Sequence, residues 1–329
     1  DPEEITFMEP QAGGACRAGN IYNLLQRVLY RMAEQGQLEY AQIPVISLNL
    51  MGEEKHTGFR ITPSLLSGGI AAGCYGDLIM CLYQQVKPYE QNPGETDRIR
   101  SQVEKKLCES IRRHRNGRHT REKNYRYACE VFSKVPVKPG KKKRVGITGE
   151  IYMKYSKLGN DDIESFLLRQ GMEPYSGGFV NYCLYLVDTE RYKAEKYQHN
   201  PVMAKACAFV LHRLCEAQKH LLTVIGETDR FQTDLQFPEL KEKVQGILAE
   251  GCNTGDGWLI AAEVIQYVEK GCGSVLILHP FGCLVSHVCE RGILQRLHAR
   301  FPDVSIQTIE YDYDQSKTLR ESRILLAIS

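Results

Sequence analysis

The chain has 329 residues, a formal net charge of +2, 43% hydrophobic residues and 25% charged residues. This length suffices for one large or two smaller α/β domains with buried cores, and the composition is that of an ordinary globular protein. No run of about 18 apolar residues occurs and the first residues, DPEEITFMEP, are acidic, so we expect a cytoplasmic protein with no membrane span and no signal peptide. Because the chain opens without a methionine, we also expect it to be a piece of a longer polypeptide.

The first part of the chain alternates between strand-like and helical patterns. Ile5 to Met8 predicts a short strand, and apolar residues at helical spacing then predict a helix from Ile21 to about Gln35, ended by Gly36. Pro44 to Leu50 predicts a second strand, and the glycine-rich apolar segment Thr62 to Gln85 predicts a closely packed helix. This alternation indicates an α/β architecture.

A basic segment follows. Asn92 and Glu95 are placed to cap a helix, which we expect to continue to about Phe132. Between Arg98 and Arg126 the chain has eleven Lys or Arg residues and three Glu residues. This segment is either a solvated face or a docking surface for phosphates or an acidic partner protein. We expect no binding to nucleic acid, because no recognised binding motif accompanies the charge.

Lys134 to Arg144 (KVPVKPGKKKR) is the best candidate for a domain boundary, since it is rich in Pro, Gly and Lys. Val145 to Thr148 then predicts a new strand. We therefore predict two Rossmann-like α/β domains with added helices and a cleft between them. The first domain is residues 1–140, with the helical, basic segment, and the second is residues 141–329.

The second half continues as strands and helices. Helices are predicted at the following places: within Gly159 to Gly171, from about Pro201 to Leu222, from Pro238 to Glu250, from Trp258 to Lys270, and from Ser316 to Ile328. A final strand is predicted in VSIQTIEYDYD, just before that last helix.

The loop around Cys283 is the most informative stretch. Ser274 to His279 predicts a buried strand, ended by Pro280 and Gly282, and a helix is predicted from Ser286 to Phe301. Cys283 then lies between the carboxyl end of a strand and the amino end of a helix, where open α/β sheets bind ligands and where a thiolate is stabilised. The alternative is an ordinary buried cysteine in a βα loop.

The twelve cysteines include no CxxC pair. Cys16 and Cys283 occupy equivalent places in the two halves, each in a glycine-containing loop between a strand and a helix. If the two sheets face each other, both thiolates point into the cleft, where soft ligands suit an iron–sulfur cluster or zinc. A further ligand would be upstream or would be Cys74, Cys252 or Cys289.

Other candidates are weaker. Glu150, at the end of a predicted strand, would relay protons or contact substrate, or it is simply an exposed strand-end carboxylate. His279 and His287 flank Cys283 by four residues on each side, and His287 would donate to a cluster or substrate, or is structural. Gly255, Asp256 and Gly257 could cradle an anion at a helix amino terminus, although they lack the dinucleotide-binding spacing.

Several motifs together resemble one family. They are GGACRAGNIYNLLQRV, PVISLNL, KPYEQNPGETD, RVGITGEIYMKY, GNDDIESFL, GDGWLIAAE, HPFGCLVSH and IEYDYD. In this order they look like the C-terminal domain of the large acyl-CoA dehydratase activase-related proteins. That domain is similar to the iron–sulfur subunits of 2-hydroxyacyl-CoA dehydratases, and the resemblance spans nearly the whole chain.

The resemblance implies a cofactor and a partner. It implies that Cys16 and Cys283 ligate a [4Fe–4S] or double-cubane cluster, with a third family cysteine upstream of this chain. Electrons would come from an ATP-hydrolysing activase domain, in cis or in trans, so that ATP acts only through that partner. The chain would then belong to an anaerobic system that transfers low-potential electrons to an acyl-CoA or another small molecule. It would be a 2-hydroxyacyl-CoA dehydratase-like lyase or a component of an ATP-dependent reductase, with a dimer left open.

The chain departs from the family pattern at two places. Ala15 replaces the proline of the usual GPC motif, and Val285 and Ser286 follow FGCL in place of Pro and Asn. Neither change removes a thiolate, but both affect the expected loop geometry. Two alternatives stay open: a cluster-free module that docks an acyl-CoA or a partner protein, and a structural zinc site at the same cysteines.

Overall fold

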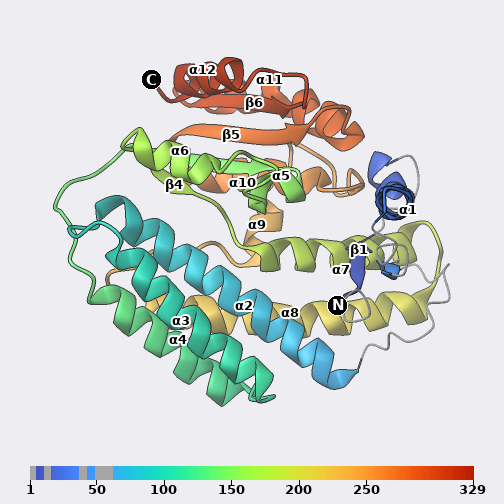
Figure 1. The fold of residues 1–329 in the computed structure, drawn as a ribbon, viewed down its shortest axis with the longest axis horizontal. Helices are drawn as coiled ribbons and strands as arrows, with labels where there is room; N and C mark the ends of the chain where they lie inside the picture. Colours follow the sequence, from blue (N-terminus) through green and yellow to red (C-terminus); the bar gives the residue numbers. More distant parts are fainter. Residues whose placement is uncertain (1–4, 11–15, 37–42, 49–61) are drawn as a thin grey trace. The chain divides into compact units, whose positions relative to one another are not determined.

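The computed structural model describes residues 5–10, 16–36, 43–48 and 62–329 (Figure 1). The chain divides into two compact units, Asp1–Thr62 and Pro63–Ser329. The boundary that we expected near residue 140 falls inside the second unit, because helices on its amino-terminal side pack against helices on its carboxyl-terminal side. The cleft expected between two domains stays a prediction.

The first unit contains a β-α-β arrangement in its described residues. Strand β1 (Phe7–Pro10) pairs in parallel with strand β2 (Val45–Leu48), and helix α1 (Ile21–Glu34) lies between them in the chain. The helix begins and ends within one residue of the prediction. The first strand begins two residues later than expected, and the last two residues of the predicted second strand, 49 and 50, lie outside the described residues.

The second unit contains a layer of long helices. These are α2 (Pro63–Val86), α3 (Glu95–Arg112), α4 (Arg118–Ser133), α7 (Phe179–Lys196) and α8 (Pro201–Gly226). Buried apolar residues of all five belong to one hydrophobic core cluster. By length and composition α2 could span a membrane, but it packs against the other four helices, as a core helix of a globular domain does.

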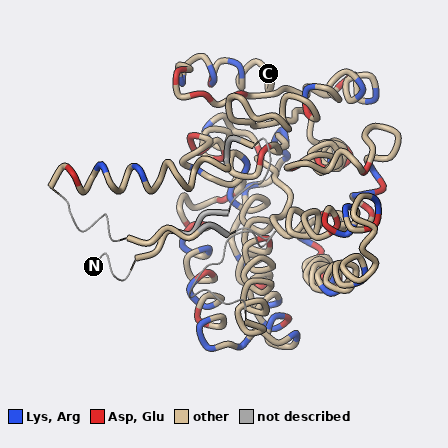
Figure 2. The backbone as a smooth tube through the Cα atoms, turned by 90° about the vertical axis from the view of Figure 1, so that its right-hand side faces the viewer, with Lys and Arg blue, Asp and Glu red and all other residues tan. Residues whose placement is uncertain are grey.

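The prediction of a single basic helix up to Phe132 is wrong, because the chain forms two helices there, α3 and α4. The backbone turns at His114, whose φ is 54°, and the Arg115 N–H donates to the Ser110 carbonyl at 3.0 Å. In both helices or directly after them, basic side chains pair with glutamates one turn away: Arg100 with Glu104, Arg113 with Glu109, and Arg126 with Glu122. Figure 2 shows basic and acidic positions interspersed along the helices of the protein. The segment therefore neutralises part of its own charge.

A four-stranded parallel sheet, covered by shorter helices, forms the rest of the second unit. Its strands are β3 (Arg144–Gly149), β4 (Glu173–Tyr175), β5 (Cys272–Pro280) and β6 (Ser305–Tyr311), in the spatial order β4-β3-β5-β6. All three neighbouring pairs are parallel. The predicted α/β fold class is confirmed by this sheet and by the helices that cover it.

Helices cover both faces of the sheet, which explains why its central strand is a continuous apolar run. On one face, Leu276 and Leu278 of β5 pack with α5 (Ile151–Tyr155), α6 (Ile163–Arg169) and α12 (Lys317–Ile328). On the other face, Val275 and Ile277 pack with α10 (Gly257–Glu269) and α11 (Arg291–Arg300). The short helix α9 (Phe237–Lys243) also contributes to the second core.

The strand order reverses direction between β3 and β5. From β3 the chain crosses to β4 on one side, whereas from β5 it crosses to β6 on the other side. Ligands in open α/β sheets bind where such a reversal separates the loops at the carboxyl ends of the strands. Gly149 ends β3 at this point with φ at 129°, and a Cβ atom there would lie 2.0 Å from the Leu278 carbonyl oxygen.

We expect Gly149→Ala to lower the free energy of unfolding by on the order of 3 kcal/mol, or to prevent folding, because the methyl group meets the backbone of β5. Urea unfolding of the full chain measures the change. Gly273→Ala is the matched control: it lies in β5, has open space around its Cβ position and should change stability by less than about 1 kcal/mol. Equal unfolding midpoints for the two variants would contradict this account of β3 and β5.

Candidate functional site

Glu150 ties the end of β3 to the neighbouring strand. Its N–H donates to the Leu278 carbonyl of β5 at 2.8 Å, and its carboxylate accepts from the Met153 N–H at 3.0 Å as the cap of α5. The side chain is half-buried, not exposed. Burial raises the pKa of Glu150, and the N–H groups of Met153 and Tyr152 oppose that shift. Glu150 therefore has a structural role as the cap of α5, next to the carboxyl ends of β3 and β5.

The loop before α10 packs against the loop that carries Cys283. A Cβ atom at Gly255 would lie 2.6 Å from the Val285 side chain, and one at Gly257 would lie 2.2 Å from the Cys252 carbonyl oxygen. Both glycines have positive φ, 56° and 29°, so glycine is needed here for backbone and space alike. This close packing holds Cys252 near the loop after β5, and the Trp258 N–H donates to the Cys252 carbonyl at 2.9 Å.

Asp256 is a buried acid at the start of α10. The residue is 6% exposed, and burial raises the pKa of its carboxyl group well above the usual range, with further increases from Glu150, Glu290 and Glu263. The amino-terminal end of α10, where an external anion was expected, is therefore next to the carboxyl group of Asp256 itself. The anion cradle predicted at Gly255, Asp256 and Gly257 stays a prediction.

Three partly buried cysteines lie in this part of the second unit, Cys252, Cys283 and Cys289. The Cys283 thiol is half-buried, and its pKa is raised by burial, with Glu290 and Glu150 adding to that shift and Ser286 opposing it. Burial also raises the pKa of Cys289, and the Cys252 and Cys283 thiols raise it further. Cys289 therefore lies within electrostatic range of both other thiols, although the three sulfur atoms are not all within 4.8 Å of one another.

Glu290 is the residue at this site that sequence reasoning missed. Its side chain is fully buried, neither carboxyl oxygen has a hydrogen-bond partner among the described residues, and burial raises its pKa to about 8. The spacing from Ser286 to Glu290, Ile293 and Leu297 follows one helical face. Because Ile293 and Leu297 are core residues, this pattern could have identified a buried acid.

A local change of helix type shapes this segment. The helix predicted from Ser286 to Phe301 instead begins as a π-helical turn, Ser286–Glu290, and continues as α11. Such turns are rare and occur often at functional sites. His287 lies on this turn, where its Nε2 atom is 3.9 Å from Oε2 of Glu310 on β6.

The remaining predicted ligands lie elsewhere. Cys74 is buried in α2, near Asp77 and Tyr125, and burial raises the pKa of its thiol to about 11, which fits a core residue. Cys16 is exposed in the first unit, and its carbonyl accepts from the Gly19 N–H at 3.2 Å. Its expected meeting with Cys283 stays a prediction, and Ala15 lies outside the described residues.

Comparisons with known proteins leave the family undecided. No family model, no curated protein and no solved structure matches the chain. The resemblance to the activase-related proteins therefore stays a prediction.

The unpaired burial of Glu290 predicts an unusual pH dependence of stability. A carboxyl group whose pKa rises from 4.5 to about 8 on folding stabilises the folded state fully below pH 4.5 and loses that contribution as the pH rises to about 8. In this window the free energy of unfolding of the wild-type protein should fall by up to about 1.4 kcal/mol per pH unit because of Glu290. We expect Glu290→Gln to abolish this part of the pH dependence. Urea unfolding from pH 4 to 9 measures the slope.

Glu216→Gln serves as the control for that experiment, because Glu216 is exposed on α8. It should leave the wild-type pH profile unchanged. A Glu290→Gln profile that runs parallel to the wild-type profile would show that Glu290 is ionised in the folded protein.

Proposed function

We propose that the chain is the iron–sulfur cluster-binding domain of a redox system that resembles the ATP-dependent activases and 2-hydroxyacyl-CoA dehydratases. In this proposal it passes low-potential electrons to an acyl-CoA or another small molecule, and an activase domain supplies the electrons. The observation that supports it best is that the thiols of Cys252 and Cys283 both lie within electrostatic range of the Cys289 thiol.

The chemistry of these residues fits such a cluster. Thiolates are the ligands that hold iron–sulfur clusters, and Cys252, Cys283 and Cys289 would provide three ligands of a four-ligand set once they move closer together. Burial raises the pKa of the Cys283 thiol and of the Cys289 thiol, which favours their protonated forms. A bound metal would favour the thiolates instead. When bound, the cluster supplies one-electron transfer at a low potential.

The surrounding carboxyl groups hold protons. The pKa of about 8 favours the protonated form of Glu290 at neutral pH, and burial and three neighbouring acids raise the pKa of Asp256 as well. The Glu290 oxygens have no hydrogen-bond partner in the described part of the chain, whereas Lys154 lies 2.7 Å from Glu263. We assign Glu290 and Glu150 as groups that take up and release protons next to the thiols.

The family resemblance implies that Cys16 is also a ligand, with a further family cysteine upstream of this chain. Two alternatives predict different outcomes. A structural zinc site at the same cysteines binds zinc and no sulfide, whereas a cluster-free docking module folds and binds its partner with neither metal. Its docking surface would be the basic segment from Arg98 to Arg126 together with the Gly255 loop.

We expect the full chain, reconstituted and purified without oxygen, to contain iron and acid-labile sulfide and to give an EPR signal after reduction. Cys283→Ser, Cys252→Ser and Cys289→Ser should each lose most of the bound iron because each removes one thiolate, and Cys16→Ala should do the same. Iron and sulfide analysis measures the loss.

Cys108→Ser is the control variant, since Cys108 is an exposed thiol on α3. It should retain iron at the wild-type level. Wild-type protein that binds no iron under these conditions, or variants at the three clustered cysteines that all retain it, would overturn the proposal.

A further inference from the structure

We propose that His279, His287 and Glu310 form a binding site for a single divalent transition metal of the zinc class. The site has nitrogen and oxygen ligands and no sulfur ligand, so it goes beyond the cluster proposed at the cysteines. Its evidence is the geometry of three side chains from three successive segments of the chain.

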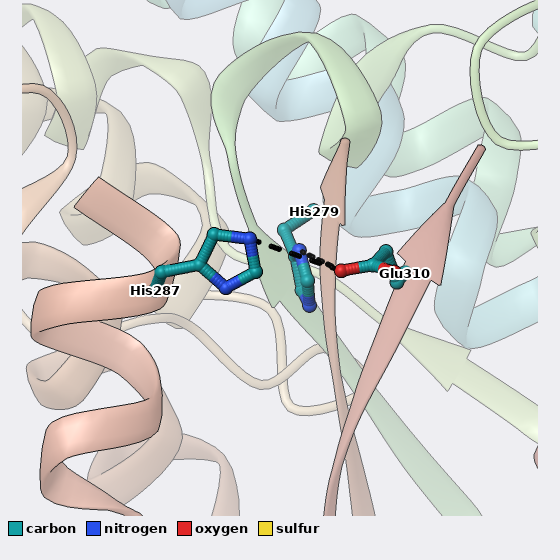
Figure 3. Close-up of side chains that lie close together, drawn as sticks. All are labelled: His279, His287 and Glu310. Atoms are coloured by element: carbon teal, nitrogen blue, oxygen red, sulfur yellow. Dashed lines mark ion pairs between the residues drawn. The ribbon is translucent and has the colours of Figure 1, made fainter. Parts of the chain in front are cut away.

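The three side chains converge on one point (Figure 3). The Nδ1 atom of His279 and the Nε2 atom of His287 each lie 3.9 Å from Oε2 of Glu310. All three ligand atoms lie within 4.8 Å of one another. The two imidazole rings meet edge to face, with their centroids 5.5 Å apart. Among the described residues this is the group whose ligand atoms come together in this way.

The sheet fixes two of the three ligands. His279 and Glu310 are direct partners in the parallel register of β5 and β6, and both are next to the last residue of their strands. Neighbouring strands place such paired residues on the same face. The π-helical turn then brings His287 to that face from the loop after β5. The site therefore rests mainly on rigid elements of the fold.

His279 has the form that a metal ligand needs. Its side chain is fully buried, Nε2 has no hydrogen-bond partner among the described residues, and Nδ1 lies 3.4 Å from the Pro280 carbonyl oxygen. Burial lowers the pKa of His279, which favours the neutral ring, and in the tautomer protonated at Nε2 the Nδ1 lone pair is free to bind a metal. A buried imidazole with poorly satisfied nitrogens is costly, and a metal bond at Nδ1 would offset part of that cost.

An ordinary ion pair explains the arrangement less well. A distance of 3.9 Å between the histidine nitrogens and the carboxylate oxygen is too long for a hydrogen bond. The carboxylate already has a cationic partner, because Arg291 Nη2 lies 3.1 Å from the same Oε2 atom. Arg291 is 46% exposed at its side chain, so it can turn towards solvent when a metal approaches.

The spacing suits a zinc-class ion after a small contraction. Bonds of about 2.0–2.1 Å in tetrahedral geometry place ligand atoms about 3.3–3.4 Å apart, so each histidine must approach Glu310 by roughly half an ångström. The half-buried His287 can make this movement. Two imidazoles and one carboxylate, with a fourth position open, are typical of zinc and of non-haem iron, and they do not suit magnesium or calcium.

Cobalt(II) titration of the full chain, stripped of metal with a chelator, tests this site. The variants are built on a background in which Cys252, Cys283 and Cys289 are all serine, so that the thiol site cannot contribute. We expect one Co²⁺ per chain, with visible d–d absorption and no sulfur-to-cobalt charge-transfer band. His287→Ala and Glu310→Gln should each weaken binding by more than the ~10–100-fold that loss of an outer-shell partner costs.

His212→Ala is the matched control, because His212 is exposed on α8 and should not alter binding. A second measurement is the shift in thermal unfolding with added Zn²⁺, which should raise the midpoint of the triple-serine background and not that of its Glu310→Gln variant. Loss of cobalt binding in the triple-serine background, or unchanged binding after both ligand substitutions, would overturn the site. Neither result depends on whether the cysteines hold a cluster.

Discussion

The parallel pairing of β3 with β5 is the interaction on which the second unit depends. It runs from Arg144 with Cys272 to Gly149 with Leu278, and the side chains on both sides of β5 are buried. Because the chain leaves this pair in opposite directions, the loops after the two strands separate and leave room for functional groups. Glu150 and His279 directly follow the last paired residues of β3 and β5, and the Glu150 N–H still donates to the Leu278 carbonyl.

The buried acids Glu263 and Glu290 differ in how far burial of the carboxyl group destabilises the fold. Glu263 is nearly fully buried too, but Lys154 and the Thr148 hydroxyl contact it at 2.7 and 2.5 Å, so its charge is compensated. Glu290 has no such partner among the described residues. A carboxyl group left in this state destabilises the fold unless it stays protonated or a cation binds nearby. Uncompensated burial of this kind is typical of sites that act on protons, electrons or ligands.

Sequence patterns predicted the local elements well, because continuous apolar runs and helical spacing are local properties. The predicted strand before Cys283 is present as β5, and the predicted helix before that strand is present as α10. The break near His114 was missed although Asn116 and Gly117 form a dipeptide typical of turns directly before α4. The approach of His279 to Glu310 depends on strand register between segments about 30 residues apart, which periodicity cannot provide. The approach of Gly255 to Val285 likewise depends on packing between distant loops.

The two candidate sites share the π-helical turn Ser286–Glu290. His287 belongs to the histidine–glutamate group, whereas Cys289 and Glu290 belong to the thiol group. Soft sulfur ligands and harder nitrogen and oxygen ligands select different metals, so the two groups need not compete for one ion. His287, Cys289 and Glu290 nevertheless share one short turn. If the proposed metal drew His287 closer to Glu310, Cys289 and Glu290 would therefore move with it.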